Sequence, residues 1–311
     1  AYVVENSEGV SYSFEQGFSM SFAFDDVAMQ IAPTAPFVTG EVDGTTSHVR
    51  ADIGVLLDET FASLGLDADD AEFAALASAF DDASFDVWIE DQRMTMDLSR
   101  FVAAMDELEP GSMGPLAAVS TGPVSVDLGQ VGGIDPWSLT QAFGEGSQVV
   151  DPSALVDALR AVESVTERGV DSVDGHDVVV YSGHLSMADY FEAMGQDIGD
   201  QLGTLGGQAG SLDAMVFGDF EDALTDLDVQ VTVMVDDENQ LRRMETSMDL
   251  GEMMASMIGD ASMIGDTVQM EMSVGLWQEF DDHGVAFEIV APDALDVTDR
   301  FGGLFGGLVT V

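Results

Sequence analysis

The sequence contains no cysteine and no lysine in its 311 residues. Without cysteine the chain can form neither a disulfide nor a thiolate metal site. Without lysine it lacks the side chain that reaches the phosphates in a Walker loop, and its glycine-rich stretch 203–210 fits no nucleotide-binding motif. A Gly-x-Ser-x-Gly nucleophile elbow and a His-Glu-x-x-His helix are also missing, so the familiar hydrolase signatures are excluded.

Long hydrophobic runs are missing too. No stretch reaches the ~18 apolar residues that a membrane-spanning helix needs. No basic segment followed by an apolar run opens the chain, as a secretory signal would. The first residue is Ala1 rather than methionine. We therefore expect an exported, processed chain whose signal segment is not part of this sequence.

Acidic residues are abundant: 59 of them face eight arginines, for a net charge of −51, yet 46% of the chain is hydrophobic. Disordered acidic chains lack apolar residues, so this acid is expected to coat a folded body. Such a surface repels nucleic-acid phosphates, which excludes a nucleic-acid partner. At high salt the Debye length falls to about 3 Å, and this composition is typical of a salt-adapted, halophilic surface.

The spacing of histidine and acidic residues along the chain gives little support for a metal site or for acid–base catalysis. His176 and His184 lie eight residues apart on one expected strand, about 26 Å, too far to share a metal. The acids at Asp67, Asp69 and Asp70 do not continue into the EF-hand pattern, although adventitious calcium there stays open. Two carboxylates suffice for glycoside hydrolysis, but the few Trp and Tyr residues do not cluster as a sugar site requires. We predict no catalytic residue, no cofactor and no metal.

Alternation of apolar and polar residues predicts antiparallel strands along most of the chain. The segment 18–24 reads as a half-buried strand, and 85–98 as a hairpin that turns at Asp91-Gln92. Asp-Gly pairs predict two further hairpins, joining 37–42 with 45–57 and 162–173 with 176–186. Residues 227–291 predict a four-strand meander whose last strand is 285–291.

Helical spacing is found in fewer segments. It predicts a helix over 58–80 that is interrupted at Gly65, and further helices that begin at Asp151, Ala188 and Ser211. We expect a single domain over 1–311, with an N-terminal tail at 1–10, an irregular crossover at 110–150 and an apolar tail at 301–311. The hexapeptide repeat over 256–266 is interpreted as a local duplication.

Eighteen methionines and eighteen phenylalanines are spread over these strands and helices. Methionine is flexible and polarisable, so it suits surfaces that fit variable apolar ligands. An ordinary core explains the same residues equally simply. A sheet with one apolar side and several amphipathic helices is nonetheless an architecture that can hold a cavity between its layers.

The stretch 169–185, GVDSVDGHDVVVYSGHL, resembles a hairpin of the actinobacterial LppX/LprG-like envelope lipoproteins, whose fold is shared with the lipoprotein carriers LolA and LolB. The strand 229–235, the Arg242-Arg243-Met244 strand and the closing stretch 285–299 are similar to the same pattern. The resemblance covers 160–300 and extends to 18–100. The lipid-bearing N-terminal cysteine of that family is absent from this chain, and the 110–150 crossover has no obvious counterpart.

This resemblance implies an α+β fold, in which a strongly curved antiparallel sheet, or half-barrel, carries helices on its concave face. It also implies a non-enzymatic envelope or cell-surface protein, membrane-associated through an anchor not visible in the chain, that binds a lipid or other amphiphile for lipid or lipoprotein carriage. An envelope protein partner is part of that expectation. The helices of 151–225 would form a lid. The residues expected to line the apolar cavity are Phe22, Phe24, Val87, Ile89, Met94, Met96, Val180, Val231, Val233, Met270, Met272 and Phe287.

A second hypothesis assigns the chain to a different functional class. In it the chain is a surface structural or scaffolding protein without a ligand, which self-assembles or binds other envelope proteins. The apolar tail at 301–311 would then be its contact surface.

Overall fold

The computed structural model describes residues 11–24, 27–31, 35–63, 71–108, 110–111, 121–130, 162–189, 227–251 and 270–300. The predicted tails at 1–10 and 301–311, the hexapeptide repeat and the acids Asp67, Asp69 and Asp70 lie outside these residues. So does the predicted helix that begins at Asp151, and so do the helices of the proposed lid beyond residue 189.

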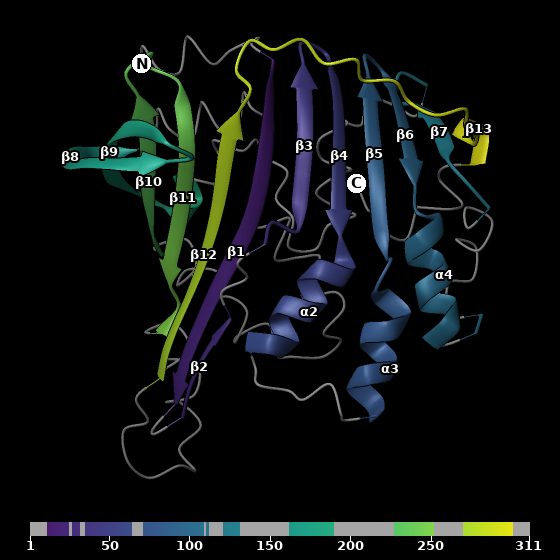
Figure 1. Cartoon of the computed structure of the whole chain (residues 1–311), viewed down its shortest axis with the longest axis horizontal. Helices are drawn as coiled ribbons and strands as arrows, with labels where there is room; N and C mark the ends of the chain where they lie inside the picture. Colours follow the sequence, from purple (N-terminus) through teal and green to yellow (C-terminus); the bar gives the residue numbers. More distant parts are fainter. Residues whose placement is uncertain are drawn as a thin grey trace. The chain divides into compact units, whose positions relative to one another are not determined.

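Thirteen strands form one sheet in the order β13-β7-β6-β5-β4-β3-β1-β12-β11-β10-β9-β8, with β2 paired to β1 (Figure 1). All described pairs are antiparallel except β13 with β7. The predicted class is therefore confirmed as an α+β fold built on one large, mostly antiparallel sheet that does not close. Among the described residues, no helix is long and apolar enough to cross a membrane.

The chain divides into two compact units. Unit 1 comprises Ala1–Glu8, Phe18–Ala32 and Val150–Glu279, and unit 2 comprises Gly9–Gly17, Pro33–Val149 and Phe280–Val311. Two long strands, β1 (Tyr12–Phe24) and β12 (Met270–Asp281), contribute residues to both units.

Unit 1 is built from hairpins. Its other strands are β2 (Val27–Ile31), β8 (Glu163–Val173), β9 (His176–Ser186), β10 (Asp228–Asp236) and β11 (Leu241–Asp249). The hairpin predicted at Asp174-Gly175 is confirmed, and both turn residues have positive φ, 46° and 82°. This is the backbone geometry that makes Asp-Gly a favourable two-residue turn.

Unit 2 contains the strands β3 (Val38–Asp43), β4 (Thr46–Asp52), β5 (Ser84–Glu90), β6 (Arg93–Asp97), β7 (Val124–Asp127) and β13 (Leu295–Asp296). The hairpins predicted at Asp43-Gly44 and Asp91-Gln92 are confirmed. The second strand of the first hairpin was predicted to run to 57, which is wrong, because a helix begins at Ile53. The Asp52 carboxylate accepts the N–H of Val55 at 3.1 Å and so caps that helix.

The described helices of unit 2 are α2 (Ile53–Ser63), α3 (Ala71–Phe80) and α4 (Ser99–Leu108), which lie together at one end of the strands that they follow or precede (Figure 1). Phe80, Ala83 and Ala104 form the centre of their core, and Leu57 and Phe101 pack against it. Helices α2 and α3 cover most of the predicted helical segment 58–80, but α2 begins earlier, at Ile53, and the predicted break at Gly65 lies outside the described residues. Neither α4 nor the strand β7, which lies within the segment interpreted as an irregular crossover, was predicted from the sequence.

The predicted fourth strand of the meander, at 285–291, is wrong, because the neighbouring position beside β12 is taken by β1. After β12 the chain instead runs across the ends of the unit 2 strands (Figure 1). We call residues 285–297 the C-terminal strap. Side chains at strand ends hold it, since Asp43 accepts the N–H of Phe287 and Glu90 that of Ala291, both at 3.1 Å. The strap ends at β13, which pairs with β7, followed by a 3-10 turn over Thr298–Arg300.

Candidate ligand-binding face

The strands of unit 1 place most of their apolar residues on one side of the sheet. The register sets Val231 opposite Gly183 of β9 and Thr246 of β11, and it sets Val233 opposite Tyr181 and Met244. Residues directly opposite one another in an antiparallel pair share a face. The apolar residues of β9, β10 and β11 at these positions therefore lie on the same side of the sheet.

The same face continues over β12 and β1. Thr246 lies opposite Leu276, which fixes the apolar side of β12. The hydroxyls of Ser21 and Ser273 form a hydrogen bond of 2.7 Å, and Ser273 belongs to the other side of β12. Because side chains alternate along a strand, Phe22 of β1 and Met272 of β12 then lie on the apolar side.

We call this surface the unit 1 apolar face. It comprises Phe18, Met20, Phe22, Tyr181, Leu185, Val229, Val231, Val233, Met244, Met248, Met272, Val274 and Leu276. Phe24 and Met270 occupy positions of the same alternation, but their side chains lie outside the described part of the structure.

Burial varies across this face. Val229 and Val231 are 1% and 5% exposed, as core residues are. On β1 and β12 the residues are only half-buried, and this includes Phe22, Met272 and Leu276. A row of large apolar side chains that keeps part of its surface uncovered can bury more area against an apolar ligand.

The opposite side of unit 1, which we call the polar side, carries ion pairs beside a few apolar residues, among them the buried Val178. Arg243 pairs with Glu245 at 2.7 Å and with Glu279, and its guanidinium lies 5.2 Å from the ring centre of Trp277. The register places Val180 on this side, opposite Met234. Val180 thus lies on the other side of the sheet from Val231 and Val233, although all three were predicted to line one cavity.

A buried ion pair fixes the turn between β10 and β11. Arg242 donates to Asp236 at 2.7 Å, and their side chains are 9% and 3% exposed. Burial by itself raises the pKa of Asp236. The N–H groups of Gln240 and Glu238 and the Arg242 guanidinium outweigh that effect and hold the pKa below its ordinary value.

In unit 2 the corresponding apolar side is closed. Val87, Ile89, Met94 and Met96 share one face and are all at most 4% exposed. Their cross-strand neighbours Val49, Val124 and Val126 are equally buried. We call this surface the unit 2 buried face. These four residues, which were expected to line the apolar cavity, are packed here as part of a core.

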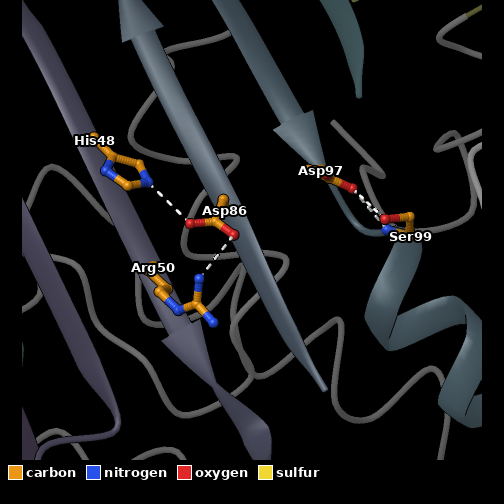
Figure 2. Close-up of polar contacts among 5 residues, drawn as sticks. All are labelled: His48, Arg50, Asp86, Asp97 and Ser99. Carbon is orange, nitrogen blue, oxygen red and sulfur yellow. Dashed lines mark hydrogen bonds and ion pairs between the residues drawn. The ribbon is translucent and has the colours of Figure 1, made fainter. Parts of the chain in front are cut away.

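The other side of the unit 2 sheet carries polar pairs (Figure 2). His48 bonds Asp86 at 2.9 Å, while Arg50 lies 3.7 Å from the second Asp86 oxygen. The His48 ring also stacks on Trp88 at 4.7 Å, with the planes 2° apart. Nearby, Asp97 accepts both the N–H and the hydroxyl of Ser99 and so caps α4. These contacts fasten strand to strand and strand to helix.

Within the described ranges, no group of three histidine and carboxylate side chains could hold a metal ion. His184 pairs with Asp228 at 2.8 Å, on the polar side of unit 1. Phe287 lies in the C-terminal strap, outside the strands of the sheet. Val274, Leu276 and Met248 were not predicted as binding residues, although each fits the alternation of its strand. Only the register shows which strands are neighbours.

No family model matches this chain, and no curated protein matches it. Among solved structures, the lipoprotein LppX of Mycobacterium tuberculosis is 9% identical, with 93% of this chain and 94% of that chain covered and a TM-score of 0.37. LprF from Mycobacterium bovis is 12% identical, with 94% and 96% covered and a TM-score of 0.35. A DUF1329 family protein from Desulfovibrio piger is 9% identical, with 96% and 92% covered and a TM-score of 0.23. LppX is one of the lipoproteins that the sequence resembles.

Proposed function

We propose that this protein is a non-enzymatic envelope or cell-surface protein that binds a lipid or another amphiphile against the apolar side of its sheet and carries it. The observation that supports this most directly is the unit 1 apolar face. Its half-buried residues on β1 and β12 include the bulky side chains Phe22, Met272 and Leu276.

Hydrophobic burial supplies the driving force for such binding. Completing the burial of one large apolar side chain contributes about 1 kcal/mol, so several half-buried residues together can hold an alkyl chain. Methionine adapts to chains of different shape, and Met20, Met248 and Met272 contribute to this face. We infer a site that selects for apolar bulk more than for one defined structure.

Location and partners belong to the same proposal. The resemblance of 160–300 to envelope lipoproteins supports an exported protein that associates with a membrane through an anchor. A strongly acidic surface repels anionic headgroups, so a membrane contact through the folded body is unfavourable unless salt screens the charge. Delivery to or from an envelope protein partner is then the simplest route for the cargo.

Purification without detergent, followed by native mass spectrometry, tests the proposal, and we expect co-purified lipid. Displacement of a hydrophobic fluorescent dye then measures affinity. Met272→Gln, on the unit 1 apolar face, is expected to weaken dye binding about tenfold. Met234→Gln is the matched control, because Met234 is equally half-buried but lies on the polar side. It should change the affinity less than twofold.

Two results would contradict the proposal. One is wild-type protein that carries no lipid and binds no dye. The other is an equal loss of dye binding in both variants, which would show that the polar side matters as much. A concentration-dependent, open-ended assembly that is insensitive to lipid would favour the structural or scaffolding hypothesis instead.

A further inference from the structure

The outermost strand of unit 1, β8, has one edge that no described strand covers. The strand order of the sheet ends at β8, and β9 is its one described partner (Figure 1). Every residue from Ser164 to Ser172 is exposed, except the half-buried Gly169. Such an edge presents a row of backbone N–H and C=O groups that can pair with a further strand.

The exposed large apolar residues of unit 1 lie on this same strand. Among the described residues of that unit, Val165 and Val170 are the large apolar residues that are most exposed, at 58% and 82%. Val170 lies opposite Val179, and Glu167 lies opposite Tyr181, on the apolar side of the sheet. Val165 is two residues before Glu167, so alternation places both valines on one side.

The sequence of β8 complements itself when a second copy runs in the opposite direction. In an antiparallel pairing centred between Glu167 and Arg168, Val165 of each copy lies opposite Val170 of the other. Glu167 of each copy then lies opposite Arg168 of the other. Apolar pairs and opposite charges placed directly across from one another both stabilise an antiparallel pair of strands.

Neighbouring registers lose this match. A shift by one residue in one direction sets Glu167 opposite Glu167 of the second copy, and a shift in the other direction sets Arg168 opposite Arg168. Like charges that lie directly opposite one another are destabilising. Either shift also separates the valines. The charges and the apolar residues of β8 therefore favour the same register.

Two β-bulges restrict which other strands fit this edge. The register with β9 shifts between Glu163 and Thr166, and again between Glu167 and Gly169. Bulges twist an edge strand and so hinder its pairing with arbitrary strands. The second bulge lies at the centre of the self-pairing, where a two-fold axis sets two identical bulges against each other. A second copy of β8 thus has the matching irregularity, which a regular strand lacks.

We propose that β8 is a dimer interface, which pairs antiparallel with β8 of a second copy of this chain over residues 165–170. This inference goes beyond the proposed function and does not depend on it. The contact is two-fold symmetric and closes after two copies, so it produces a dimer and not a filament.

The size and charge of the contact set the expected affinity. A pair of six-residue strands buries less than the about 1,200 Å² of a stable interface, so we expect a dissociation constant of about 100 µM in high salt. Each copy carries a net charge of −51. In dilute buffer this repulsion is poorly screened, and it should weaken the dimer by about tenfold or more.

Sedimentation velocity over a concentration series in high salt measures the dimer. Val170→Thr keeps a β-branched side chain but weakens the apolar contact at both valine pairs, so it should raise the dissociation constant about tenfold. Val290→Thr is the matched control, because Val290 is 67% exposed but lies in the C-terminal strap. It should leave the dissociation constant unchanged.

Charge reversal tests the register. Glu167→Arg and Arg168→Glu should each abolish the dimer, because each sets like charges opposite one another beside the two-fold axis. The double variant that carries both substitutions restores opposite charges and should recover most of the affinity. Arg168 also donates to Ser182 at 2.6 Å within one copy, so the melting temperature of each variant checks its fold. The valine variants do not touch this bond.

Three results would overturn the inference. The first is a wild-type protein that stays monomeric at every concentration in high salt. The second is a dimer that Val170→Thr weakens no more than Val290→Thr does, since the contact would then lie elsewhere. The third is a folded double variant that dissociates as completely as the single charge variants. Lipid and dye binding, measured on the same samples, test the proposed function separately.

Discussion

At the scale of single residues, the ion pair between Asp236 and Arg242 illustrates why buried charges are sensitive to substitution. The carboxylate has exchanged water for one guanidinium and the N–H groups of Glu238 and Gln240. Removal of one partner leaves the other charge buried and uncompensated, at a cost of about 3 kcal/mol or more. The pair also holds the β10–β11 turn in register, next to the β-bulge at Met234/Val235.

The lowered pKa of Asp236 predicts a defined dependence of stability on pH. Because the folded-state pKa lies below the unfolded value of about 3.9, the stabilisation is complete above that value. It is lost as the pH falls through the lower, folded pKa. Asp236→Asn should therefore be less stable than wild type at neutral pH in high salt, and the difference should shrink below about pH 4. Urea unfolding at several pH values measures this, and a difference that stays constant down to the acid limit would contradict the assignment.

Gly54, at the start of α2, supports a second residue-scale prediction. A Cβ atom there would lie 2.6 Å from the backbone oxygen of Phe80 and 2.7 Å from that of Asp81. Backbone cannot move aside cheaply, so Gly54→Ala should destabilise unit 2 by about 2 kcal/mol. Gly129→Ala is the control, because its Cβ would meet the flexible end of Gln92 at 2.6 Å. Thermal unfolding should distinguish the two, and equal melting temperatures would show that α2 shifts to make room.

At the scale of elements, local chemistry predicts the hairpins well and the pairing of distant strands poorly. Turn residues such as Asp174-Gly175 act within a few positions, so their hairpins follow directly from the sequence. The fourth strand of the meander alternates correctly at Val285, Phe287 and Ile289. It forms no strand because β1, more than 200 residues earlier, occupies the neighbouring place beside β12.

In the candidate site, too, local sequence predicts some features and the pairing of distant strands determines the others. Alternation identifies Phe22, Met272 and Val231 as apolar positions of their strands, and the register brings them to one face. The run Val178-Val179-Val180 contains no alternation, so its sequence cannot indicate which side each valine takes. The register places Val180 on the polar side.

The C-terminal strap yields a prediction at this scale. Its backbone is held at two points by side chains, so Glu90→Ala should free the amide of Ala291 and speed its hydrogen exchange. Glu90→Gln is the matched variant, because it keeps an oxygen acceptor at the same length and should preserve most of the protection. Hydrogen exchange followed by NMR measures the protection of the Ala291 amide in both variants. Equal exchange in the two variants would show that the Glu90 contact does not protect the strap.

At the scale of the whole molecule, the acidic composition sets the conditions under which the fold persists. The net charge of −51 arises without a single lysine, so the repulsion between carboxylates is offset by few cations. Much of that repulsion is screened once the Debye length falls to about 3 Å, and it returns as the length rises toward 30 Å in dilute buffer. Charge of one sign opposes the compact state. The apolar faces that carry the proposed function therefore depend on the surface that surrounds them.

We predict that the melting temperature falls on dialysis from high salt into dilute buffer, and that sucrose does not restore it as sodium chloride does. Protonation should provide the same relief without salt. In dilute buffer, acidification from pH 7 toward 5 should raise the melting temperature because it removes part of the charge, whereas at high salt the same change should have little effect. Below about pH 4 the loss of the Asp236 carboxylate acts in the opposite direction, so stability in dilute buffer should pass through a maximum. A melting temperature that is independent of salt at neutral pH would show that the charge is already compensated in the folded state, and it would contradict this account of the acidic surface.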